Sequence, residues 1–580
     1  MPRQSSRTLW AAPPWSAFPA RVPSLLTDLP VVLAGLALFY GLVSLGRYWA
    51  GPVNPQPEIH LTPAALPLYA LYSLARLGVA YGLSLAFTLV YGTVAAHNAR
   101  AERVMIPLLD TLQSIPVLSF LPPVMVSMVA LFPTRQLGVE LGAILLIFTG
   151  QVWNMTFSVY SSIKNVPREM AEAAEVYRLS WWQKFLQLEL PYSAIGLVWN
   201  SMMSVAGGWF FLMACEMFVL GNRDLRLPGL GSYLQTAANA GDTRAILWGV
   251  AVMVAVIVLM DQLIWRPVIA WSGKFKVEQV EASETHRSPV LDLLRRSKIL
   301  PRMARKTTIP AREALTLFFA RREKLATGRR LVPLAVGWVV AVAAVLGLLF
   351  ALTKMALLLS STSWPDLRGL LLGAGATFLR VELTLALAAL WTIPVGVFIG
   401  LRPRLSAIAQ PIAQIAASVP ATALFPIVLL LLIRAGGGLG IGSIVLLLLG
   451  TQWYLLFNVI AGASAIPTDL KEVCDVFHFG RVERWRRLLL PGIFPYLVTG
   501  FVTASGGAWN ASIVAEYFRF QGHTYSITGL GATISHATDS GNFRLLLAAT
   551  VVMATLVVTV NRLVWRRLYG LASTKFKLES

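Results

Sequence analysis

Charged side chains are scarce in this 580-residue chain. Asp, Glu, Lys and Arg make up only 13% of the residues, whereas hydrophobic types make up 56% and the mean hydropathy is +0.65. Soluble domains carry about 25% charged residues, so this composition excludes an ordinary soluble protein. Several apolar runs reach about 20 residues, the length of a helical membrane span. Because the runs are continuous rather than alternating, they predict an all-α polytopic membrane protein and argue against a β-barrel.

Cysteine and histidine are also rare, with 2 and 6 residues. The topology predicted below places Cys215 near the outer face and Cys474 in a cytoplasmic loop, so we expect neither a disulfide nor a metal cluster from them. No Ser/His/Asp or metal-ligand spacing occurs on one side of the membrane. A G-x-x-x-x-G-K-[ST] phosphate loop is lacking too, since Gly273-Lys274 is followed by Phe275. We therefore expect no enzymatic activity, no catalytic residue, no metal and no cofactor in this chain.

The net charge of +21 is concentrated in short loops and one central segment. This distribution follows the positive-inside rule, so we expect contact with membrane lipids and none with nucleic acid. The basic loops and both termini are predicted to be cytoplasmic, as in a multi-pass protein of a bacterial inner membrane. Six spans are predicted in each half, at 29–49, 73–96, 104–131, 137–162, 192–217 and 244–271, and at 331–353, 375–400, 407–433, 438–463, 492–517 and 543–568.

The predicted organisation has five parts. They are a cytoplasmic N-terminal segment (1–28), a first six-span unit (29–271), a basic cytoplasmic linker (272–330), a second six-span unit (331–569) and a cytoplasmic tail (570–580). Two short amphipathic patches in the linker predict helices on the anionic inner leaflet, with a regulatory docking surface as the alternative.

The two six-span units are a tandem duplication. At an offset of 300 residues Trp153 matches Trp453, Pro191 matches Pro491, and Gly229-Leu230-Gly231 matches Gly529-Leu530-Gly531. Earlier in each half the offset is 304. An even number of spans per unit predicts parallel repeats, related by an axis along the membrane normal.

One polar loop between spans is part of this duplication. It reads EAAEVYRLSWWQKFLQLELP from 172 to 191 and EVCDVFHFGRVERWRRLLLP from 472 to 491. We interpret each copy as a short helix, a turn and a second helix that enters the membrane. Small residues on the first helix let a partner surface approach closely, and its glutamate offers a carboxylate to a basic partner. The residues predicted to contact a partner are Glu172, Ala173, Ala174, Arg178, Glu472, Val473, Cys474 and His478.

These loops resemble the EAA motif of permease subunits of binding-protein-dependent ABC importers. Glu172-Ala173-Ala174 and Leu188-x-Leu190-Pro191 fit that motif, whereas Arg178 and His478 stand where the family has glycine. Val473-Cys474 replaces Ala-Ala in the second copy. The phrases SIPVLSFLP (114–122), GGWFFLMACEMF (207–218) and PGLG (228–231) are similar to the nitrate/sulfonate/taurine branch.

The resemblance implies a type I ABC importer fold with two permease units fused in one chain. It implies two cytoplasmic ATPase subunits, which bind ATP and Mg, and an extracytoplasmic substrate-binding protein. The solute is expected to be a small oxyanion, a sulfonate or a related organic molecule, moved by alternating access. A secondary transporter of the six-plus-six type is the alternative, although we find no mid-membrane titratable group for it.

Residues of the translocation path are predicted from broken spans and polar clusters. Prolines interrupt backbone hydrogen bonds within a span, which is tolerated where protein or a water-filled cavity satisfies them. Lining the path and structural packing are both open interpretations. The candidates are Ser114, Pro116, Ser418, Pro420, Gln151, Trp153, Gln452, Trp453, Trp209, Trp509 and Asn510.

Glu216 and Glu516 fall late in the fifth span of each half. Ionisable groups at membrane depth are costly and usually functional, so an outer gate is one interpretation. The other is a structural ion pair or hydrogen-bond anchor.

Overall fold

The structure is a computed structural model. It describes residues 46, 48–51, 58–220, 223–275, 289–296, 363–434, 436, 438–520 and 523–575, with isolated residues between 305 and 360. Eight of its helices are long and apolar enough to cross a membrane, or up to ten if each of two bent pairs is one span. The predicted all-α polytopic fold is confirmed. Ten of the twelve predicted spans correspond to these helices, and the other two, 29–49 and 331–353, lie almost wholly outside the described residues.

The described part of the first half begins with η1 (Pro63–Ala65) and the long helix α2 (Leu66–His97). It continues through these elements: α3 (Ala99–Ser114), η2 (Val117–Phe120), α4 (Leu121–Leu131), α5 (Leu137–Lys164), α6 (Arg168–Val176), α7 (Trp181–Lys184), the π-helical turn η3 (Phe185–Glu189), α8 (Leu190–Glu216), β1 (Val219–Leu220), β2 (Arg223–Asp224), α9 (Leu230–Ala240), α10 (Thr243–Met260), the π-helical turn η4 (Asp261–Trp265), α11 (Arg266–Ser272) and η5 (Gly273–Phe275). Helix α12 (Pro289–Arg296) lies in the linker.

The second half repeats this order. Its elements are α16 (Trp364–Gly400), α17 (Pro403–Ser418), α18 (Ala421–Arg434), α19 (Leu439–Ala465), α20 (Thr468–Val476), α21 (Arg481–Arg484), the π-helical turn η6 (Trp485–Leu489), α22 (Leu490–Ala515), β3 (Tyr517–Phe520), β4 (His523–Ser526), α23 (Leu530–Asp539), α24 (Phe543–Val560), the π-helical turn η7 (Asn561–Trp565) and α25 (Arg566–Lys575). The two short antiparallel hairpins β1–β2 and β3–β4 were not expected from the sequence.

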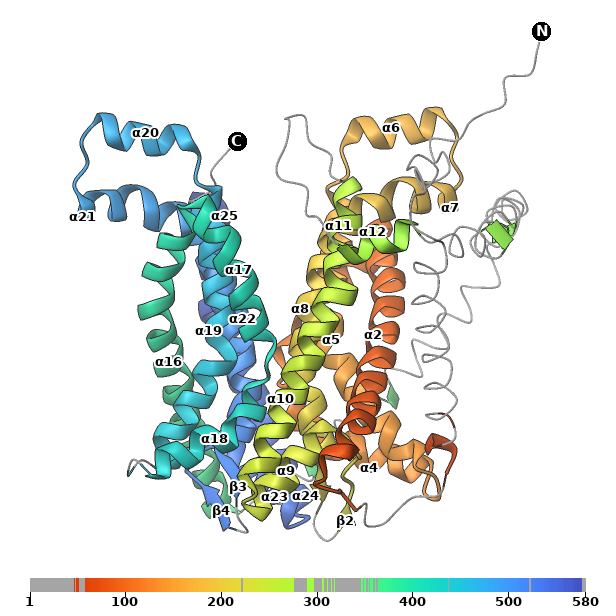
Figure 1. Cartoon of the computed structure of the whole chain (residues 1–580), viewed down its shortest axis with the longest axis vertical. Helices are drawn as coiled ribbons and strands as arrows, with labels where there is room; N and C mark the ends of the chain where they lie inside the picture. The colour runs from red at the N-terminus through yellow and green to blue at the C-terminus, as the bar shows by residue number, and fades with distance from the viewer. Residues whose placement is uncertain are drawn as a thin grey trace.

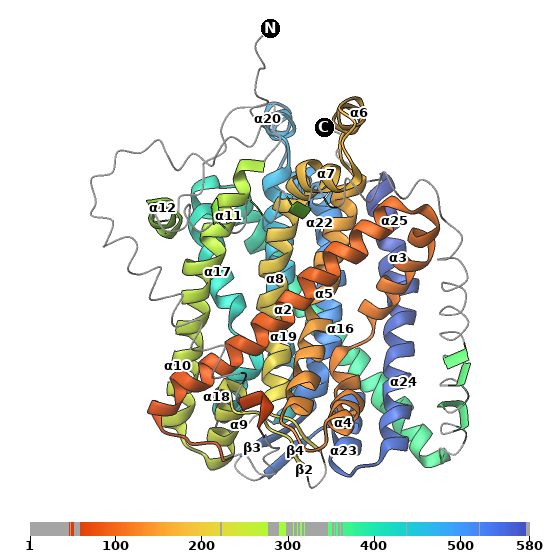
Figure 2. The same cartoon turned by 90° about the vertical axis from the view of Figure 1, so that its right-hand side faces the viewer.

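Two groups of long helices stand side by side, one from each half (Figure 1). Helices α6 and α20 project from the same end of the molecule (Figure 1), which we call the coupling end after the partner contact predicted for these loops. The hairpins, α9 and α23 lie at the opposite end in both views, which we call the outer end after the orientation predicted from the sequence (Figures 1 and 2). One continuous hydrophobic core contains residues of both halves, among them Trp209 and Trp509. The halves are therefore packed against each other as one body.

The third predicted span of each half is bent rather than straight. Helices α3 and α4 meet at 86°, and α17 and α18 meet at 81°. The breaks occur at Pro116 and Pro420, each of which lies just before a helix resumes. The next prolines along each chain segment, Pro122 and Pro426, do not interrupt a helix. Pro122 lies in the first turn of α4, where it has no hydrogen bond to lose, and Pro426 lies within α18.

A buried carboxylate joins three segments at the outer end of the first half. Glu216, the last residue of α8, accepts hydrogen bonds from Arg76 (2.8 Å) and Ser73 (2.7 Å) of α2 and from the Gly231 backbone N–H (2.7 Å) at the start of α9. Arg76 also forms a bidentate pair with Glu140 of α5, at 2.6 and 2.7 Å. The Arg76, Glu140 and Glu216 side chains are all fully buried.

The second half has the same arrangement with one difference. Glu516 binds Arg380 and Thr377 of α16 and the Gly531 N–H of α23. Within the described residues Arg380 has no second carboxylate partner, and Gly440 stands where the first half has Glu140. These contacts favour the ion-pair interpretation of both glutamates, since neither side chain is exposed to a partner.

This difference predicts unequal losses of stability. Glu216→Gln leaves Arg76 paired with Glu140, so it should cost about 1 kcal/mol for the altered hydrogen bonds. Glu516→Gln leaves Arg380 with no carboxylate among its described contacts and should cost about 3 kcal/mol, as expected for a broken buried pair. Thermal unfolding of the purified variants in detergent measures both. Equal shifts in Tm would contradict the role assigned to Glu140.

Candidate functional site

The loop between α5 and α8 ends its first helix with a left-handed residue. Arg178 has φ +49°. Its N–H bonds to the Glu175 carbonyl (2.9 Å), and the Leu179 N–H bonds back to the Ala174 carbonyl (3.0 Å). These two bonds define a Schellman motif, which turns the chain sharply after α6. Ser180 then caps α7 through a capping box with Gln183.

The second copy has the same backbone geometry. His478 has φ +51°, and its N–H bonds to the Asp475 carbonyl at 3.1 Å. The Phe479 N–H bonds to the Cys474 carbonyl at 3.0 Å, which completes the motif. Arg178 and His478 therefore adopt the conformation that glycine favours, although neither is glycine.

The predicted contact residues divide by exposure. Glu172, Ala173, Glu472 and Val473 are exposed, whereas Ala174 and Cys474 are buried and support the turn. Four strongly exposed apolar side chains of the loops were missed by the sequence analysis. They follow each other at the C-terminal ends of α6 and α20: Val176 (79% exposed), Tyr177 (79%), Val476 (73%) and Phe477 (69%). The sequence could have indicated them, because apolar residues recur in an otherwise polar loop at the offset of 300. Exposed apolar side chains that lie together are typical of an interaction surface.

Two of the four tryptophans proposed for the path are packing residues. Trp209 and Trp509 are fully buried in the shared core, so they do not line an open path. Trp153 and Trp453 are half-buried on α5 and α19. Gln151 and Gln452 are buried, and the Gln151 amide packs against Gly208 of α8, where a Cβ would approach it to 2.4 Å.

Two side chains of the second half form hydrogen bonds with the backbone just after the break at Pro116. The Leu118 N–H donates to Oδ1 of Asn510 on α22 (3.4 Å), and the Ser119 carbonyl accepts from Thr550 of α24 (3.2 Å). Asn510 is therefore an interface residue that satisfies the broken backbone. Pro420 is buried at the corresponding break. Ser114 and Ser418 end α3 and α17, and their side chains lie outside the described part of the chain.

Tyr454 of α19 lies between the two halves. Its ring would be 3.3 Å from a Cβ at Gly507 of α22, and its hydroxyl 3.7 Å from a Cβ at Gly207 of α8. The two glycines are equivalent positions at an offset of 300. Tyr454 therefore lies against one glycine of each half, which we call the central contact, while its own counterpart in the first half is the smaller Asn154.

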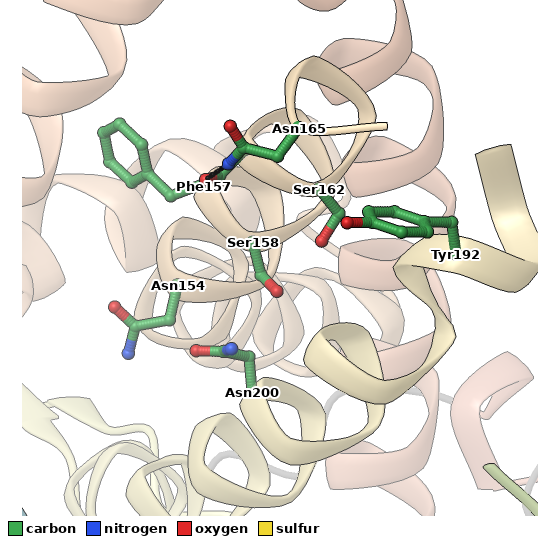
Figure 3. A pocket seen from close by; sticks show the side chains of 8 residues that line it. Asn154, Phe157, Ser158, Ser162, Asn165, Tyr192 and Asn200 are labelled. Carbon is green, nitrogen blue, oxygen red and sulfur yellow. Dashed lines mark hydrogen bonds between the residues drawn. The ribbon is translucent and has the colours of Figure 1, made fainter. Parts of the chain in front are cut away.

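A polar pocket lies on the coupling-end side of this contact, and we call it the inner pocket. Its volume is 460 Å³. Helix α5 contributes Asn154, Phe157, Ser158, Ser161, Ser162 and Asn165, and α8 contributes Tyr192 and Asn200. Figure 3 shows Asn154 and Asn200 facing each other and the Tyr192 hydroxyl directed toward Ser162. Seven of the eight residues are polar and none is charged.

A second pocket of 440 Å³, the outer pocket, lies between the halves at the outer end. Its two arginines are neutralised locally, since Arg226 pairs with Asp224 and Arg519 with Asp539, each at 2.5 Å. Burial raises the pKa of the Tyr517 phenol, and its hydrogen bond to Asp539 adds to this rise. The outer pocket therefore presents no unpaired cation from these two arginines.

One acidic residue within a span was overlooked in the sequence analysis. Glu382 is half-buried at the middle of α16, and within the described residues it forms no recorded ion pair. Its counterpart at an offset of 304 is Gly78.

A family model matches both halves of the chain. The model of the binding-protein-dependent transport system inner membrane component matches residues 88–263 and 392–575, together more than half of the chain. The chain belongs to this family. The first match includes the α6 loop and Glu216, and the second includes the α20 loop and Glu516. The permease therefore contains two copies of the family's unit.

Curated permeases are similar over parts of the chain. The nitrate import permease protein NrtB of Leptolyngbya laminosa is 27% identical over 197 residues, 34% of this chain and 67% of NrtB. The bicarbonate transport system permease protein CmpB of Synechococcus elongatus is 29% identical over 149 residues, 26% of this chain and about half (52%) of CmpB. The taurine transport system permease protein TauC of Escherichia coli is 27% identical over 254 residues, 41% of this chain and 83% of TauC.

The left-handed residues of the permease loops predict a gain on substitution by glycine. A non-glycine residue in this conformation costs about 1–2 kcal/mol. Arg178→Gly and His478→Gly should each relieve part of that cost and slow local opening of the loop. Hydrogen exchange of the amides at 174–180 and 474–480 measures this, with Gly480→Ala as a control at a residue of negative φ. Faster exchange in the glycine variants would contradict the strain assigned to these positions.

Proposed function

We propose that this permease is the membrane-spanning part of an ATP-driven importer. Two cytoplasmic ATPase subunits would bind ATP and Mg and dock on the α6 and α20 loops. An extracytoplasmic binding protein would deliver the solute to the outer end. The solute proposed is a small oxyanion, a sulfonate or a related organic molecule, which is the class that the curated relatives' names suggest.

The observation that carries this proposal is the pair of matched loops at one end. Both have the same helix length, the same Schellman turn and two exposed apolar residues at the tip. Figure 1 shows α6 and α20 well apart on separate halves, so each is free to contact its own partner. A single docking site would not need two equivalent surfaces.

The mechanism proposed is alternating access. Closure of the ATPase pair would bring α6 and α20 together, and the rigid helices behind them would transmit that movement to the outer end. The central contact at Tyr454 would then open toward the outer pocket. Hydrolysis would return the halves to an arrangement in which the inner pocket is accessible from the coupling end.

The test is binding-protein-stimulated ATPase activity in lipid nanodiscs. The permease is co-expressed with the ATPase encoded beside it, and neighbouring binding proteins are screened with candidate anions and sulfonates. Stimulation that requires a loaded binding protein supports the importer. Purified permease without any associated ATPase, together with ion-gradient-driven uptake, would contradict it.

The exposed loop tips predict a loss of partner binding. Tyr177→Asp combined with Phe477→Asp places a charge in each apolar contact and should weaken ATPase association at least tenfold, since an interface hot spot contributes about 2 kcal/mol or more. Co-purification and ATPase stimulation are the measurements. Tyr569→Asp changes an exposed aromatic residue on α25 at the same end and serves as the control. Equal retention of the ATPase by all three proteins would exclude docking at the tips.

Glu382 allows the secondary-transporter alternative to be tested. A carboxylate within a span is the group that an ion-coupled carrier would titrate. Because the ATP-driven mechanism makes no use of it, Glu382→Gln should leave ATP-driven uptake in proteoliposomes within about twofold of wild type. Uptake that follows a proton gradient and disappears in this variant would favour the alternative.

A further inference from the structure

Four hydroxyl groups converge on the inner pocket without donating a hydrogen bond. They belong to Ser158, Ser161, Ser162 and Tyr192, and no donation from any of them is recorded in the described part of the chain. Elsewhere in the spans, hydroxyls such as those of Thr156 and Thr451 donate to the carbonyl four residues earlier. The pocket hydroxyls therefore remain available to a ligand (Figure 3).

The pocket faces the second half of the molecule. Thr156 contacts Thr88 of α2 (3.1 Å) and so marks the opposite side of α5. At about 100° per residue, Asn154, Ser158 and Ser161 lie roughly 140–200° around the helix from Thr156.

The position of Asn200 on α8 also indicates that the pocket faces the second half. Asn200 lies two turns from Gly207 on one helix face, and Gly207 contacts Tyr454 of the second half. The inner pocket therefore opens into the space between the halves, about 10 Å from the central contact toward the coupling end.

Among the described residues of the second half, the positions equivalent to the pocket are mostly small. Ser161, Ser162, Asn165, Tyr192 and Asn200 correspond to Ala461, Gly462, Ala465, Gly492 and Gly500. The space is filled instead, because a Cβ at Gly462 would lie 3.0 Å from the Tyr496 side chain and one at Gly500 would lie 3.1 Å from Asn458. Tyr496 in turn corresponds to Gly196, whose missing side chain leaves room for the Ser158 hydroxyl, 2.8 Å from the position of a Cβ.

We propose that the inner pocket binds the solute on its way out of the permease, and that the solute is an organic molecule with a sulfonate-type oxyanion head group. This inference rests on the proposed importer function. The head group accepts hydrogen bonds and donates none, which matches the four pocket hydroxyls and the lack of a carboxylate among the lining residues. Asn200 is not counted among these free donors, because its amide N–H already donates to the Gly196 carbonyl at 2.9 Å. The rings of Phe157 and Tyr192 provide apolar surface for a short organic tail, and 460 Å³ is ample for such a molecule.

The chemistry of the wall also suits release. No arginine or lysine lines the pocket, so the head group is held by hydrogen bonds from uncharged donors, without the ion pair that a fixed cation would add. The solute contacts the first half, and the second half supplies the Tyr454 barrier. The two fused units thus have different roles, whereas identical subunits would have the same role.

The test is direct ligand binding to the full chain in its complex with the ATPase, in nucleotide-free nanodiscs. Ethanesulfonate is the probe, and saturation-transfer NMR detects its contact with protein. Ethanol, which lacks the sulfonate, is the matched compound. The variant is Ser162→Ala with Tyr192→Phe, which removes two of the four pocket hydroxyls. The control is Thr499→Val, an exposed hydroxyl on α22 next to Gly500, the counterpart of Asn200.

We expect transfer to ethanesulfonate but not to ethanol, reduced at least fivefold in the pocket variant and unchanged in the control. No transfer in wild type, or equal transfer in the pocket variant, overturns the proposal. Similar transfer to ethanol overturns the assignment of the head group.

A transport readout separates this inference from the proposed function. The pocket variant should keep binding-protein-stimulated ATPase activity and move several-fold less solute per ATP, because docking and coupling are untouched. If ATPase stimulation is absent in wild type, the proposed function fails whatever the NMR result. If stimulation and solute moved per ATP are both normal in the pocket variant, only the pocket assignment fails.

Discussion

The carboxylate at the end of α8 and its counterpart at the end of α22 hold each outer end together. Glu216 and Glu516 each contact a helix of the second span through an arginine and a hydroxyl, and the start of the next helix through a glycine N–H. An unpaired charge at this depth is costly, so these three segments stay together. The lack of a side chain at Gly229 and Gly529 is part of the same arrangement, since a Cβ there would lie 2.3 Å or less from carboxylate atoms. Movement is therefore expected between the halves rather than within their outer ends.

Contacts between the halves have a different character. The broken backbone near Pro116 relies on Asn510 and Thr550 for its hydrogen bonds, and Tyr454 lies against a glycine of each half. The Asn510 bond is long at 3.4 Å, and the glycines at Tyr454 allow close approach of the helices without interlocking side chains. These contacts can be exchanged at lower cost than a buried ion pair. The molecule thus combines firm outer ends with a central interface that is easier to rearrange.

Much of the fold could be predicted because hydrophobic length and duplication are properties of the chain itself. Spans, their order and the paired loops followed from runs of apolar residues and a constant offset. The turn after the first helix of each loop could also be predicted. Its left-handed φ values occur at Arg178 and His478, residue types that do not by themselves indicate this conformation. The burial of Glu216 and Glu516 could not be predicted. A glutamate at the end of a span is compatible with a gate or with an ion pair, and only the folded structure places Arg76 or Arg380 beside it. The polar residues of the inner pocket recur at helical spacing on α5, but only the packing of α8 decides that they line a cavity.

Fusion of two units removes the requirement that they remain alike. The α6 and α20 loops keep the same helix length, turn and exposed tips, as two equivalent docking surfaces for the proposed ATPase subunits would require. Among the described residues the interior diverges. Glu140 pairs with Arg76 where the second half has Gly440, the inner pocket is lined by the first half, and Tyr454 extends from the second half where the first has Asn154. A pair of identical subunits would place two pockets and two tyrosines around the axis, where the rings would compete for one central space. One ring and one pocket fit that space, so the asymmetry follows from sharing a single path between two covalently joined halves.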